Sequence, residues 1–300
     1  MKLNIWKKLS LSWNCLVENW KSYVGTGIVY GLIAILVGIF WFGVLFIWVK
    51  NVITWWFGGW VLFWLGIALL LVASRLGKAL LFVSSFYITK SYAENKKLNF
   101  KEAFKKWLTE LKYKVLIDLW YFVIGFLAIL WFAILIGLWW LLASISDIWQ
   151  AILLVLILVG TYFLIKICLM FFLSDYYCFD NRKFDFKTFL ESRKLVKWKY
   201  WYLILNIIAL FLVIFVVSFV VMLPLQPLNP NINLLKDNSL YWFQMTVLWL
   251  FTIGTVIYYA VSYIVWLLLQ IYSFIYFFFV YEEIKKDSKS DEEEKENPAN

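Results

Sequence analysis

Five polar or charged residues lie inside long apolar stretches of the sequence, and these are the side chains that could do chemistry there. They are Arg75, Lys78, Asp118, Lys166 and Gln270. An ionisable group near the centre of a membrane helix costs about 2.5–3.5 kcal/mol, so its presence favours a function or a polar partner. Together the five predict a polar cluster that admits an anionic or polar solute, or a lipid headgroup.

The cluster has a second interpretation, which is purely structural. Lys166 and Gln270 each precede by eleven residues a tyrosine near the end of an apolar run. At 1.5 Å per residue Lys166 would lie about 16 Å from that helix end, deeper than a lysine stem snorkels comfortably. The alternative is a salt bridge to Asp118 or hydrogen-bonded helix packing, with Arg75 and Lys78 snorkelling. The sequence leaves both interpretations open.

The chain lacks the residues that most enzyme mechanisms require. It has no histidine, which removes the Ser-His-Asp triad and the histidine metal helix, and its three cysteines are isolated. Carboxylates near the run ends could bind a metal or act as acid and base, but we expect them to be solvated. These carboxylates are Asp175, Asp180, Glu282 and Glu283. We therefore expect no enzyme, no cofactor and no metal site.

The composition indicates what must position these residues. The chain of 300 residues is 64% hydrophobic and only 16% charged, whereas soluble domains are near half apolar and a quarter charged. A net charge of +9 could suggest nucleic acid, but the basic residues fall in short segments between apolar runs. That placement is typical of membrane proteins and excludes nucleic acid as the expected partner.

Six apolar runs have the length of a membrane span or more. They cover residues 23–49, 53–89, 115–143, 148–174, 200–223 and 242–281. The second and sixth are too long for one upright helix, so we expect them to tilt, lie partly in the interface or bend back. Basic residues exceed acidic ones in segments 1–21, 90–114 and 180–199 but not in the alternate connections. This pattern predicts that those segments and both termini are cytoplasmic.

Three similar units follow one another in the chain, at about 1–97, 98–183 and 184–286. Each opens with a basic segment that spaces apolar residues three and four apart, as in Phe100, Phe104 and Trp107. This spacing predicts an amphipathic helix on the cytoplasmic leaflet, followed by a hairpin of two spans. The expected fold is thus an all-α polytopic domain, 1–286, with three such repeats. An acidic tail at 287–300 is expected to be disordered in the cytoplasm.

The chain resembles a known family at this point. The openings Phe-Lys-x-x-Phe at Phe100 and Phe-Lys-x-Phe-Leu at Phe186, with Arg-Lys-Leu-Val-Lys-Trp-Lys-Tyr-Trp from Arg193, carry the resemblance. They resemble the membrane domain appended to some glycerophosphodiester phosphodiesterases, and related six-span prokaryotic families. The soluble phosphodiesterase domain is missing. The resemblance implies a fold and a prokaryotic plasma membrane, and it carries over no catalytic residue.

These patterns favour a non-enzymatic scaffold or accessory subunit of the plasma membrane. Its expected partners are the lipid bilayer, with anionic headgroups attracted by the basic segments, and another membrane protein. The alternative is a small transporter or lipid-handling protein that uses the polar cluster described above.

Overall fold

A computed structural model describes residues 4–52, 56–142, 147–197, 199–228 and 253–296, and no strand occurs among them. The helices in chain order are α1 (Ile5–Glu18), α2 (Trp20–Val52), α3 (Trp56–Ala93), α4 (Phe100–Leu142), α5 (Asp147–Phe171), α6 (Ser174–Asn181), α7 (Phe186–Glu191), α8 (Arg193–Val196), α9 (Tyr200–Met222), the 3-10 helix η1 (Leu223–Leu228) and α12 (Ile253–Glu296). The all-helical class is confirmed.

Short polar residues set several helix boundaries. Asn4 accepts a hydrogen bond from the Lys7 amide before α1, and Asn99 accepts one from the Glu102 amide before α4. These caps satisfy backbone amides that the first helical turn leaves free. Asn95 adopts a left-handed φ of 57° just after α3, which asparagine tolerates better than most residues. Asn95, just after the end of α3, and Asn99, just before the start of α4, therefore bound the short turn that joins these two helices.

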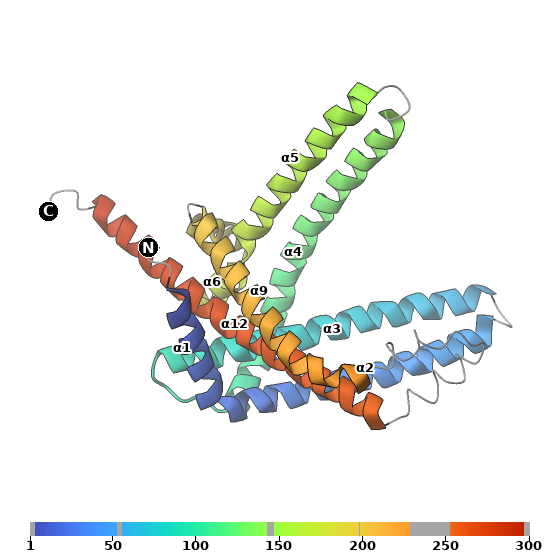
Figure 1. Ribbon diagram of the computed structural model, residues 1–300, viewed down its shortest axis with the longest axis horizontal. Helices are drawn as coiled ribbons and strands as arrows, with labels where there is room; N and C mark the ends of the chain where they lie inside the picture. The colour runs from blue at the N-terminus through green and yellow to red at the C-terminus, as the bar shows by residue number, and fades with distance from the viewer. Residues whose placement is uncertain (1–3, 53–55, 143–146, 198, 229–252, 297–300) are drawn as a thin grey trace.

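Three helical hairpins spread from one packed region, which we call the junction (Figure 1). The hairpins are α2 with α3, α4 with α5, and α9 with α12. The junction consists of the buried residues of α1 and α6–α8 together with the adjoining ends of the long helices. Every residue of α3 from Ala79 to Thr89 is buried there. A helix covered on all sides is a core helix, so the end of α3 is the centre of the junction.

The longest apolar runs form single helices that exceed the membrane thickness. α3 has 38 residues, α4 has 43 and α12 has 44, which correspond to roughly 57–66 Å. The hydrocarbon core is only about 30 Å thick. The excess length of α3 and α12 packs in the junction, so the described parts of these runs neither end early nor bend back. The second amphipathic segment is likewise no separate helix, because α4 continues through it from Phe100.

The described residues contain six helices that are long and apolar enough to cross a membrane. Each overlaps one of the six expected runs, as expected for a multi-pass membrane protein. In the most apolar window of the candidate spans beginning at Phe100 and Leu154, only 6% of residues are buried, and in that beginning at Tyr200 11% are. These three spans are therefore little covered by the rest of the chain, whereas the span that ends at Ala93 is 47% buried and the one that begins at Val256 is 39% buried.

The last described helix reaches into the acidic end of the chain. α12 continues without interruption to Glu296, and the disorder expected for 287–300 stays a prediction. Glu and Lys are good helix formers, and neither Gly nor Pro interrupts the segment before Pro298. A helix already begun within the junction can propagate through such residues, because extension does not repeat the cost of nucleation.

Candidate functional site

The junction holds a buried lysine between two carboxylates. Lys114 on α4 lies 2.6 Å from Asp118, one turn further along the same helix, and 3.0 Å from Asp175 on α6. The Lys114 side chain is 7% exposed. A buried ammonium is tolerated only when nearby acceptors replace its hydration. The two carboxylates do this, and they tie α6 to α4.

A second ionic group surrounds Asp180 at the end of α6. Lys90 of α3 lies 2.6 Å from this carboxylate, Lys285 of α12 forms an ion pair with it, and the Tyr281 hydroxyl donates a hydrogen bond of 2.9 Å. The Asp180 side chain is 7% exposed. Three helices that are distant in sequence therefore meet at one carboxylate.

A third group joins the first helix to the last two. The Lys8 ammonium on α1 donates to the Tyr202 hydroxyl on α9 and to the Glu283 carboxylate on α12, both at 2.7 Å. Tyr202 also donates a hydrogen bond to Glu283. Lys8 is 4% exposed, so these two partners replace most of its hydration.

These ionic groups correct the expectation that the carboxylates are solvated. Asp175, Asp180 and Glu283 are paired with lysines, because the helices that carry them are packed in the junction. A carboxylate held by an ammonium is a poor general base and a poor metal ligand. Among the described residues, no group of His, Cys, Asp and Glu is arranged to hold a metal. The arrangement is suited to fixing helices in place.

The five residues of the expected polar cluster have separate surroundings. Arg75 and Lys78 are exposed on α3, and Asp118 is paired with Lys114 rather than with a lysine of another span. In the part of the chain that the structure describes, no hydrogen bond or ion pair joins two of the five. Asp118 belongs to the junction, and sequence spacing could have shown its partner, because Lys114 and Asp118 are four residues apart.

Lys166 lies nearer a helix end than the sequence suggested. α5 ends at Phe171, only five residues further on, because the chain turns at residues 172–173 before α6 begins. The distance from Lys166 to the end of its helix is thus about 8 Å rather than 16 Å. The Lys166 ammonium lies 5.8 Å from the ring centroid of Tyr200, the first residue of α9.

Gln270 lines a groove between α9 and α12. The groove has a volume of about 490 Å³ and is also lined by Ser218, Ser262, Ser273 and Met222. The Ser262 and Ser273 hydroxyls donate to carbonyls of their own helix. The Gln270 Oε1 atom is buried and accepts no hydrogen bond from the described residues. Gln270 is therefore separated from Lys166 by its own groove and its own neighbours.

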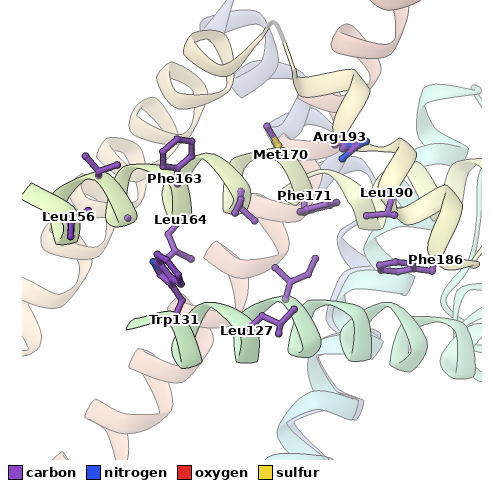
Figure 2. Close-up of a pocket in the computed structure, with 14 residues that line it drawn as sticks. Leu127, Trp131, Leu156, Phe163, Leu164, Met170, Phe171, Phe186, Leu190 and Arg193 are labelled. Atoms are coloured by element: carbon purple, nitrogen blue, oxygen red, sulfur yellow. The ribbon is translucent and has the colours of Figure 1, made fainter. Parts of the chain in front are cut away.

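A larger and more apolar groove lies between α4 and α5. It has a volume of about 770 Å³. Figure 2 shows Leu127 and Trp131 of α4 on one side and Leu164 of α5 on the other, with Leu190 and Arg193 at the end nearest α7 and α8. Arg193 is the one charged residue among the described residues that line this groove. The sequence does not indicate this groove, because the apolar residues of its two walls are those of an ordinary membrane helix.

Cys15 and Asp185 are among the groups outside the spans whose pKa values are shifted. Burial raises the pKa of the Cys15 thiol on α1 to about 11, although a hydrogen bond with Tyr23 opposes the shift. A hydrogen bond from the Thr188 hydroxyl lowers the pKa of Asp185, which caps α7. The first group is inert at neutral pH, and the second is a helix cap. Neither indicates catalysis.

Comparison of the chain with protein-family models, with curated proteins and with solved structures finds no match. The resemblance to the membrane domain of certain phosphodiesterases therefore stays a prediction.

Proposed function

We propose that this chain is a non-enzymatic scaffold or accessory subunit of the plasma membrane. The observation that carries the proposal is the contrast between the junction and the spans. Three ionic groups fix the helices to one another at the junction, whereas the spans that begin at Phe100, Leu154 and Tyr200 leave most of their residues uncovered. The chain thereby presents helix faces in a fixed arrangement.

Uncovered span faces are suited to binding other membrane helices. Helix association in lipid depends on close packing, since lipid tails are as apolar as the side chains. Phe122 and Phe126 stack at 6.3 Å on an exposed side of α4, and Phe215 and Phe219 do so on α9. Such rigid aromatic pairs offer large contact areas at little cost in side-chain entropy. They are the surfaces that we assign to a partner.

In this proposal the junction faces the cytoplasm. The three lysine-rich segments begin before α2, α4 and α9, and the positive-inside rule places all of them, with both termini, on that side. The amphipathic parts of the three repeats would then be α1, the first turns of α4, and α7 with α8. Their exposed lysines would attract anionic lipid headgroups at about 1 kcal/mol each.

The separate surroundings of Arg75, Lys78, Asp118, Lys166 and Gln270 support a structural role over a shared solute site. A transporter needs polar groups that converge on one substrate. Here one of the five is in the junction, one borders α9 and one lines the α9–α12 groove. This distribution favours the scaffold over the transporter.

Site-specific photo-cross-linking in native membranes tests the proposal. A benzophenone amino acid is placed at Phe126 or Phe215, and as a control at Ile275, which is fully buried in the junction. We expect one discrete protein adduct from the two exposed positions and none from the control. The variants Phe122→Ala and Phe126→Ala combined should reduce co-purification of that protein in mild detergent.

Two results would contradict the scaffold. Exposed positions that label only lipid would leave the chain without a partner. Purified chain in vesicles that moves an anionic solute, with the activity lost in Lys166→Leu, would establish the transporter instead.

A further inference from the structure

The groove between α4 and α5 is long, narrow and apolar along almost its whole length. Its lining on α5 extends from Leu156 to Phe171, about 22 Å along the helix. One leaflet of the hydrocarbon core is only about 15 Å deep. The groove therefore reaches from the helix end beside the junction across the depth of a leaflet.

The groove narrows part-way along its length, between α4 and α5. The two walls approach each other at Gly160, where an added Cβ would lie 3.3 Å from the Trp131 indole nitrogen. The groove thus suits a single flexible chain.

Arg193 supplies a positive charge at one end of this groove. It is exposed on α8, and the structure gives it no hydrogen bond or ion pair with any described residue. Lys194, next in the chain, is also exposed but does not line the groove. The groove therefore has an apolar body and a cationic end.

We propose that this groove binds one anionic phospholipid, with an acyl chain between α4 and α5 and the phosphate on Arg193. A planar guanidinium matches a phosphate with two parallel hydrogen bonds. The apolar walls suit an acyl chain, and their length suits one leaflet. This site stands on different residues from the scaffold proposal, which assigns the partner to the exposed aromatic faces.

The test uses the full chain in nanodiscs with a diazirine-bearing acyl chain on either phosphatidylglycerol or phosphatidylcholine. Cross-linked peptides are identified by mass spectrometry. We expect phosphatidylglycerol to label the segments 124–131 and 156–171. Arg193→Gln should lower this labelling by about fivefold, while Lys194→Gln, the adjacent exposed cation, should leave it within about twofold.

A second pair of variants tests the acyl part of the site. Leu164→Trp narrows the groove and should abolish the labelling, whereas Leu158→Trp lies on the same helix outside the groove lining and should not. Thermal unfolding identifies any variant that fails to fold. If Leu164→Trp fails to fold, the labelling of Arg193→Gln, which changes an exposed residue, decides whether the groove binds the lipid. Equal labelling by the two lipids, an Arg193→Gln equal to wild type, or labels spread along all spans would overturn the proposal.

Discussion

The ammonium of Lys8, in the first helix, lies 2.7 Å from the carboxylate of Glu283, near the end of the last helix. The two residues are separated by 275 positions in the chain. This ion pair adds a specific polar contact to the packing of α1 on α12. Removing it therefore tests whether the ionic groups of the junction stabilise the fold.

Lys8→Met should lower the free energy of unfolding by about 2–3 kcal/mol, because it leaves Glu283 and Tyr202 without their shared donor. The value is below that of a fully buried pair, since Glu283 is 31% exposed. Titration with denaturing detergent, followed by tryptophan fluorescence, measures the change. Lys7→Met removes an exposed lysine from the same turn and is the control. Equal effects of the two variants would show that the ion pair contributes nothing.

Lys114→Met should be more harmful than Lys8→Met. It leaves two carboxylates, Asp118 and Asp175, side by side in the junction without their counter-ion, and breaking such a buried pair costs about 3–5 kcal/mol. The same detergent titration measures it, with the exposed Lys105→Met as control. Replacing Asp175 by Met as well should recover part of the loss, and no recovery would mean that the lysine acts alone.

The six spans could be predicted from sequence because the signal is a sum over twenty or more residues. The run 200–223, for example, holds no charged residue and matches α9. A backbone in lipid has few alternatives to a helix, so the length of the apolar runs is enough to predict the all-helical fold class. The lengths of α3 and α12 were also visible as long runs, but their use as the core of the junction depends on contacts between distant segments.

The candidate site was less predictable, for two physical reasons. The break between α5 and α6 at residues 172–173 has no Gly or Pro to mark it, so the distance from Lys166 to the end of its helix was overestimated. The partners Lys114 and Asp175 are separated by 61 positions, and only the packing of α6 on α4 brings them together. The sequence alone therefore does not distinguish a solvated carboxylate near the end of a span from a carboxylate that is paired with a lysine.

Cys15 should make the stability of the chain depend on pH in the alkaline range. Burial raises its pKa from 9.0 to about 11 in the folded chain. The unfolded chain therefore loses this proton first, and the stability of the folded state falls by about 3 kcal/mol as pH rises from 9 to 11. Unfolding titrations across this range measure the loss.

The comparison that isolates the thiol uses Cys15→Ala and Cys168→Ala. The first should flatten the alkaline part of the stability profile, whereas the second removes an exposed thiol on α5 and should leave it unchanged. Alkylation at pH 8 should likewise modify Cys168 but not Cys15 in the folded chain. Rapid modification of Cys15 would contradict its burial.

Gly77 should be required for the close packing of α2 on α3. A Cβ at this position would lie 2.7 Å from the Cδ2 atom of Tyr30, closer than side chains tolerate. The Tyr30 ring cannot move freely, because it packs at 6.3 Å on Tyr263 and at 6.0 Å on Trp266. Gly77→Ala should therefore destabilise the chain by about 1–3 kcal/mol, the usual cost of overpacking.

Gly125→Ala is the matched control, since nothing lies within 4 Å of a Cβ added there. It should be neutral or stabilise α4 by up to about 1 kcal/mol, because alanine is the better helix former. Tyr30→Leu should partly rescue Gly77→Ala by removing the ring that causes the clash. A Gly77→Ala variant as stable as Gly125→Ala would show that the two helices pack less closely than the structure has them.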